Sequence, residues 1–148
     1  MQINVPNDIL IPEIRRIIDM GSEVTLMTKG NSMLPYIIGG RDSVRLKKTS
    51  FETVQKGDII LAETSGGHFV LHRVIHKGTD RLTLRGDGNI KGSEICRPEN
   101  IIGIVTKIIT SSGQEKTPVK ARFWRAIGPF PRRCMLAVYR RTILKLGK

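Results

Sequence analysis

Short apolar stretches recur about every ten residues between residues 24 and 84, and glycine-containing turns separate them. The stretches lie at 24–28, 43–47, 59–62, 69–75 and 82–84. Several of them alternate apolar with polar side chains and are rich in β-branched residues, which is typical of strands. Strands at this spacing predict a mainly β body, either a barrel or a sandwich.

A helix is expected at each end of the chain. Residues 12–20 predict a short helix, with Pro12 at its first position and Gly21 just past its end. Its isoleucines fall on one face, as in a helix that packs on the body. Residues 132–147 also have helical spacing.

Charge is distributed unevenly along the chain. The net charge is +12, and residues 116–148 hold ten lysines and arginines but no acid, which leaves +2 for residues 1–115. We therefore expect two parts: a β-rich domain at 1–115, which includes the N-terminal helix, and a basic amphipathic tail at 116–148.

The basic tail combines its charge with apolar and aromatic side chains. An apolar stripe is expected at Leu136, Tyr139, Ile143 and Leu146. Basic residues fall opposite it at Arg133, Arg141, Lys145 and Lys148. The residues suited to a membrane interface are Phe123, Trp124, Phe130 and Tyr139. Residues 122–148 are therefore expected either to lie on an anionic membrane surface or to pack their stripe on the body.

The cysteines and the apolar segments of the chain indicate where in the cell the protein is expected. Cys96 and Cys134 are far apart and lack metal-ligand spacing, so neither a disulfide framework nor a zinc site is expected. The chain has no run of about eighteen apolar residues, and its first residues lack the features of a secretory signal. We expect a cytoplasmic protein without metal or cofactor, peripheral on the inner face of the membrane if its tail binds lipid.

One serine lies in a segment built for a turn, Gly30-Asn31-Ser32-Met33-Leu34-Pro35. Gly30 tolerates unusual backbone angles, and Pro35 fixes its own φ while pushing Leu34 toward extended geometry. Such a segment can present the Ser32 hydroxyl from a rigid backbone. An ordinary turn or a helix N-cap is the competing interpretation, since serine and asparagine favour both.

A histidine and an aspartate follow at positions that suit a catalytic triad. His72 lies between two valines on one face of the expected strand at 69–75. A lone histidine there is usually structural, but beside Ser32 it becomes a candidate general base. Asp87 in Gly86-Asp87-Gly88-Asn89 is the candidate third member, because triads occur in several chain orders. Asp87-Gly88 is also a strong hairpin-turn dipeptide, and a turn can present a carboxylate too.

Taken together, these segments resemble the type I signal peptidases and the LexA-type self-cleaving repressors. The nucleophile motif at 30–35, a Gly-Asp strand at 56–60, the Gly-Asp-Asn box at 86–89 and a closing strand at 100–105 occur in that family's order. Leu71-His72-Arg73-Val74 resembles the endoplasmic-reticulum and archaeal branch, where histidine replaces the usual lysine base. Ordinary signal peptidases carry a membrane anchor before the serine, and the residues given before Ser32 do not predict one, so we do not expect the usual membrane-embedded role.

The resemblance implies a fold and a mechanism. The fold would be the β-rich barrel or sandwich of that family, with Ser32 as nucleophile and His72 as base. Imidazoles are poised for such work, with an ordinary pKa of about 6.5. Asp87 would orient the base, and Glu94 is the alternative, since the resembled branch has a second acid after its Gly-Asp-Asn box. The Ser32 N–H would supply the oxyanion hole; Gly30 offers no hydroxyl there, and Asn31 would substitute.

The implied activity is that of a serine endopeptidase that cleaves a leader or signal-like peptide with small residues before the cut. A non-catalytic peptide-binding or regulatory module on the same fold is the alternative. A third class, a nucleic-acid binder that uses the basic tail, is not expected, because the chain lacks zinc-finger spacing, basic heptads and aromatic RNA-binding motifs.

Overall fold

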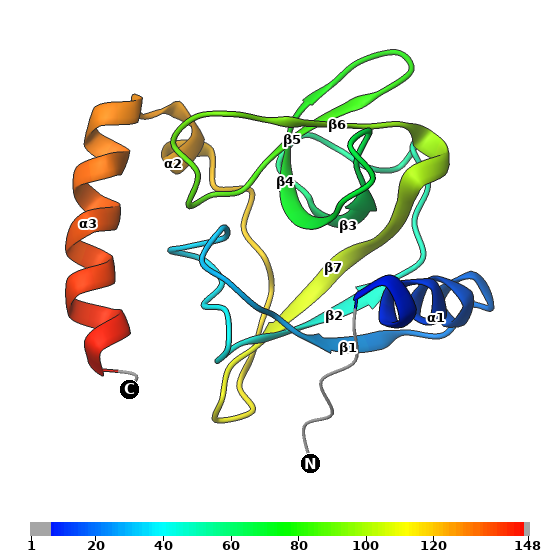
Figure 1. Cartoon of the computed structure of the whole chain (residues 1–148), viewed down its shortest axis with the longest axis horizontal. Helices are drawn as coiled ribbons and strands as arrows, with labels where there is room; N and C mark the ends of the chain where they lie inside the picture. The colour runs from blue at the N-terminus through cyan, green and yellow to red at the C-terminus, as the bar shows by residue number, and fades with distance from the viewer. Residues whose placement is uncertain (1–6, 147–148) are drawn as a thin grey trace.

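The body of the protein is one antiparallel sheet (Figure 1). The structure is a computed structural model that describes the backbone of residues 7–146 and the side chains of residues 9–121 and 124–141. The eight strands are β1 (Val24–Met27), β2 (Ser43–Lys47), β3 (Ile59–Glu63), β4 (Phe69–Lys77), β5 (Leu82–Arg85), β6 (Glu94–Cys96), β7 (Ile101–Ile109) and β8 (Glu115–Lys116). Seven follow the order β1-β2-β7-β3-β4-β5-β6, and β8 pairs with β7. The prediction of a mainly β body is confirmed, and the strands form an open sheet.

The expected strand at 59–62, which is apolar at every position, corresponds to β3, and this strand is buried on both faces of the sheet. Ile59 and Leu61 belong to the core cluster on one face of the sheet, whereas Ile60 and Ala62 belong to the cluster on the other face. Successive side chains in a strand point to opposite faces, so a strand covered on both sides has no solvent-facing position. The sheet therefore has two apolar cores that share its central strands.

Helix α1 (Asn7–Asp19) covers one face of the sheet beside β1 and β7. It begins five residues before the expected start at 12, so Pro12 lies inside the helix and not at its first position. Ile11, Ile14 and Ile18 are buried on one stripe, while Pro12 faces solvent. Three buried isoleucines contribute roughly 1.5–3 kcal/mol each, which exceeds the cost of about 3 kcal/mol for an interior proline.

The C-terminal segment forms helices α2 (Arg122–Ala126) and α3 (Pro129–Leu146), and a short 3₁₀ helix at Pro98–Asn100 precedes β7. Trp124 and Leu136 are buried in a third cluster with Leu34 and Ile38. One face of the basic tail thus packs on the body, on the loop between β1 and β2. The expected stripe residues Ile143 and Leu146, the basic residues Lys145 and Lys148, and the aromatic Phe123 lie outside the described side chains.

The opposite face of α3 is exposed to solvent. Phe130 is 74% exposed and Val138 61% exposed, although both are apolar. In the described part of the chain, no helix is both long and apolar enough to cross a membrane.

Candidate active site

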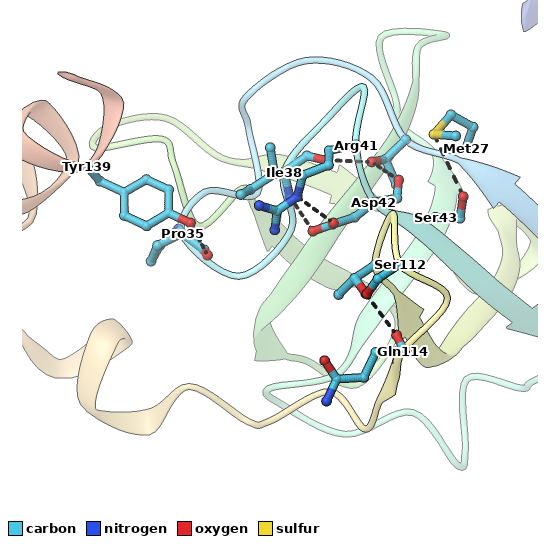
Figure 2. Close-up of polar contacts among 11 residues, drawn as sticks. Met27, Pro35, Ile38, Arg41, Asp42, Ser43, Ser112, Gln114 and Tyr139 are labelled. Atoms are coloured by element: carbon cyan, nitrogen blue, oxygen red, sulfur yellow. Dashed lines mark hydrogen bonds and ion pairs between the residues drawn. The ribbon is translucent and has the colours of Figure 1, made fainter. Parts of the chain in front are cut away.

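Ser32 lies in the loop that joins β1 to β2, and buried polar contacts close this loop at its base. The Thr28 N–H and hydroxyl both donate to the Asp42 carbonyl, at 3.1 and 2.7 Å. The Asp42 carboxylate accepts bonds from the Ile38 N–H at 2.9 Å and from Arg41 Nε at 3.0 Å (Figure 2). Asp42 is only 2% exposed, so these contacts hold the loop from inside.

Glycines clamp the Ser32 turn from two sides. Gly39 touches the backbone of Gly30, and Gly86 and Gly88 touch the backbone around Ser32 so closely that a Cβ at any of the three would overlap backbone atoms. The Gly88 N–H donates to the Ser32 carbonyl at 2.8 Å. The Gly-Asp-Asn box therefore supports the serine turn directly, and only glycine fits at these approaches.

The backbone of the turn leaves one donor open. Gly30 has a φ of 74°, which glycine adopts readily. Within the described residues, the Ser32 N–H has no acceptor. This donor suits a developing oxyanion. Asn31, the expected second donor, is exposed beside it.

His72 lies on β4, opposite Ile60 of β3, and is 6% exposed. Its Nδ1 is 3.1 Å from Oε2 of Glu94, the first residue of β6. An ionised carboxylate only accepts hydrogen bonds, so Glu94 selects the tautomer with the proton on Nδ1. The lone pair of Nε2 is then available to accept a proton.

Ser32 and His72 line the same cavity, which has a volume of about 310 Å³. Most of its wall is apolar, including Leu10, Ile11, Leu26, Met33, Phe69 and Leu71. No hydrogen bond joins the Ser32 hydroxyl to His72 among the described side chains. Catalytic hydrogen bonds are often long before substrate binds. Lys29 also lines the cavity, but its side chain is exposed.

Asp87, the first expected orienter, is the partner of Arg73 in this structure. Arg73 Nε and Nη2 donate to the two Asp87 carboxylate oxygens at 2.8 and 2.7 Å. Arg73 Nη1 donates to the carbonyls of Gly57 and Val119, both at 2.7 Å. Burial raises the pKa of Asp87, and the Arg73 guanidinium opposes this shift. The carboxylate within hydrogen-bond distance of His72 is therefore that of Glu94.

Arg73 is a supporting residue that the sequence analysis did not single out. It is completely buried, and its guanidinium lies 5.2 Å from the centre of the Tyr36 ring. An arginine inside an expected strand with mostly apolar neighbours was the available signal, because a buried charge requires a partner. Trp124 adds a further tie from α2, since its Nε1–H donates to the Asp87 carbonyl at 2.8 Å.

Ser32 contributes a hydroxyl and His72 an imidazole to one cavity, and the Glu94 carboxylate contacts that imidazole. Among the described side chains, no group of three or more His, Cys, Asp and Glu residues is placed to hold a metal ion. Comparisons of the sequence with protein-family models and with curated proteins find no match.

Proposed function

We propose that the protein is a serine endopeptidase of the signal-peptidase type, in which Ser32 is the nucleophile, His72 the general base and Glu94 the residue that orients the base. The observation that carries the proposal is the 3.1 Å contact between His72 and Glu94 beside a cavity that Ser32 also lines. A serine hydroxyl needs an adjacent base to become a nucleophile, and an imidazole held by a carboxylate is such a base.

The proposed reaction has two halves. His72 Nε2 accepts the Ser32 proton while Oγ attacks the carbonyl carbon of the scissile peptide bond. The oxyanion of the tetrahedral intermediate accepts a bond from the Ser32 N–H, with Asn31 as the second candidate donor. The imidazolium then gives its proton to the leaving amine. His72 Nε2 then takes a proton from water as the water oxygen attacks the acyl carbon. The ester bond to Ser32 Oγ breaks, and the imidazolium returns the proton to Oγ.

The proposed substrate is an extended leader or signal-like peptide. β1 is an edge strand, and its residues Leu26 and Met27 line the cavity together with Ser32. An extended peptide can add to such an edge through backbone hydrogen bonds, with alternate side chains in the cavity. We also propose that the substrate has small residues before the cleaved bond. This part of the proposal rests on the resemblance of the sequence to signal peptidases.

Family and location complete the proposal. The finer fold is that of the signal peptidase and LexA-type group, and the order of the nucleophile loop, the His72 strand and the Gly-Asp-Asn box supports it. The location is cytoplasmic, with residues 122–148 on the anionic inner face of the membrane. Exposed Phe130 and Val138 on α3 support that contact.

A fluorophosphonate probe tests the proposed activity directly. We expect the probe to label the wild-type protein, and Ser32→Ala to abolish labelling. Ser22→Ala is the matched control, because Ser22 is exposed and lies outside the cavity. Equal labelling of wild type and Ser32→Ala would refute the assignment. If a folded wild-type protein neither reacts nor cleaves a library of leader peptides, the non-catalytic peptide-binding module is the better description.

A further inference from the structure

A second hollow lies apart from the Ser32 cavity and is lined by positive charge. Its volume is about 640 Å³, and it shares no lining residue with the Ser32 cavity. We call it the basic hollow, and its residues are Lys56, Ile75, Arg85, Arg125, Ala126 and Arg132. Four of these six side chains are cationic, and none is acidic.

The cations of the basic hollow come from four separate parts of the fold. Lys56 precedes β3, Arg85 ends β5, Arg125 belongs to α2 and Arg132 to α3. Packing of the basic tail on the sheet therefore assembles the hollow. Bringing like charges together is unfavourable unless an opposite charge joins them.

Arg132 is the residue that most needs such a partner. It is 7% exposed, and its Nη2 donates to the Ile90 carbonyl at 3.3 Å. Its Nε is buried and has no hydrogen-bond partner among the described residues. Burial and the neighbouring charge of Arg85 lower the pKa of Arg132, and the Asp87 carboxylate opposes this shift. A buried N–H without an acceptor is rare in folded proteins, so Arg132 has hydrogen-bonding capacity that the described residues do not use.

We propose that the basic hollow binds a phosphate group, as a phosphomonoester or a diphosphate, with the Arg132 guanidinium as one of its cationic partners. A phosphate dianion matches four surrounding cations better than a single carboxylate does. Its several oxygens can also accept bonds from guanidinium groups that approach from different directions. Lys56, which is exposed at the rim, supplies a compact charge of the kind that phosphate sites also use.

Two arginines of the basic hollow also donate hydrogen bonds to the segment that runs from Gly88 to Glu94. Arg85 Nε donates to the Gly92 carbonyl at 2.7 Å, and Arg132 donates to the Ile90 carbonyl. This segment begins at Gly88, which donates to Ser32, and ends at Glu94, which contacts His72. A bound phosphate would therefore fix two residues that support the candidate site. The binding itself does not depend on the proposed peptidase activity.

Calorimetric titration of the full chain with inorganic pyrophosphate tests the site. At near-neutral pH and an ionic strength of about 0.15 M, we expect saturable binding to one site and a higher melting temperature with ligand. Arg132→Met should weaken binding about tenfold or more, since it removes a charge-assisted bond. Arg133→Met is the matched control: it removes the same charge from an exposed neighbour and should change affinity by about twofold or less.

A second pair of variants covers the case in which Arg132→Met does not fold. Lys56→Met removes an exposed lining charge, and Lys47→Met removes an exposed charge from β2 outside the hollow. Only Lys56→Met should weaken pyrophosphate binding. Equal losses in both pairs would show a net-charge effect and would overturn the proposal.

Vesicles distinguish a lipid headgroup from a soluble phosphate. Phosphatidic acid carries a phosphomonoester, so phosphatidylcholine vesicles that contain it should bind Arg132→Met clearly more weakly than wild type and Arg133→Met if the source is lipid. Pyrophosphate should then compete. Arg132-dependent binding of pyrophosphate without Arg132-dependent vesicle binding assigns the hollow to a soluble ligand. If neither probe distinguishes Arg132→Met from Arg133→Met, the site does not exist.

Discussion

Arg73 and Asp87 form a buried ion pair that ties strand β4 to the loop supporting Ser32. Two hydrogen bonds of 2.8 and 2.7 Å join them, and their exposures are 0% and 4%. Gly88, the residue after Asp87, donates to the Ser32 carbonyl. The ion pair therefore helps to fix the serine turn relative to β4.

Removing one partner of this pair should be costly. We expect Arg73→Met to lower the free energy of unfolding by about 3–5 kcal/mol, because it leaves the Asp87 carboxylate buried without a partner. Urea denaturation followed by circular dichroism measures the change. Arg81→Met is the control, since Arg81 pairs with Asp80 at the surface and its loss should leave the free energy of unfolding nearly unchanged. Equal effects would contradict a structural role for Arg73.

Glu94 and Asp87 should respond differently to loss of charge. Glu94→Gln should reduce the rate of peptide cleavage while leaving the melting temperature nearly unchanged, because Glu94 is partly exposed and contacts the base. Asp87→Asn should lower the melting temperature, because it leaves Arg73 buried without its counter-charge. Cleavage assays and thermal denaturation of both variants separate the two roles. A stable Asp87→Asn protein beside an unstable Glu94→Gln protein would reverse our assignment.

The identity of the base can be read from variants of His72 and Lys29. His72→Ala should be nearly as damaging as Ser32→Ala, since members of a triad act as a unit. Lys29→Gln should leave cleavage within a few-fold of wild type. Loss of cleavage in Lys29→Gln with activity kept in His72→Ala would make Lys29 the base.

The two cysteines should differ strongly in reactivity. Cys96 is fully buried, and burial raises its pKa to about 11, so its thiolate is scarce at mildly alkaline pH. Cys134 is exposed on α3. Iodoacetamide should therefore modify the native protein once, at Cys134, and the native Cys134→Ser variant should resist modification. Mass spectrometry after digestion gives the site, and rapid labelling of Cys96 in the folded protein would disprove the buried position of β6.

Membrane contact through α3 has its own test. Phe130→Ser should reduce flotation with anionic vesicles, because Phe130 is the most exposed aromatic side chain among the described residues of the basic tail. Met20→Ser is a suitable control, since Met20 is 72% exposed but lies beyond α1, far along the chain from the tail. Vesicle binding that is the same in both variants would leave α3 as a helix that only packs on the body.

The sequence predicted the strands well because their signal is local. Alternation and β-branched residues located the five strands from β1 to β5, but β6 and β8 are too short to show a pattern. The helix start was wrong for a related reason. In the local sequence, a proline indicates the first position of a helix. Burial of Ile11 against the sheet extends α1 on the N-terminal side of Pro12, and this is a tertiary effect that the local sequence does not show.

The site was harder to predict because pairing is decided in three dimensions. The sequence placed Ser32 and His72 as candidates, and both line one cavity. The sequence could not decide whether Asp87 or Glu94 orients His72. Both acids follow the expected strand at 82–84, and only the fold determines which side chain each of them contacts. Arg73 occupies the Asp87 carboxylate and leaves Glu94 for His72.

The contact between Tyr139 and Pro35 spans 104 positions of the chain (Figure 2). Trp124 reaches back to Asp87 in the same way, across 37 positions. A ribosome delivers these partners late, after the whole sheet has emerged. We expect the serine loop to lack the contacts from α2 and α3 in the nascent chain until these helices have been made, so that assembly of the site follows assembly of the sheet. If the proposed function holds, this order of synthesis would delay activity until α3 is in place.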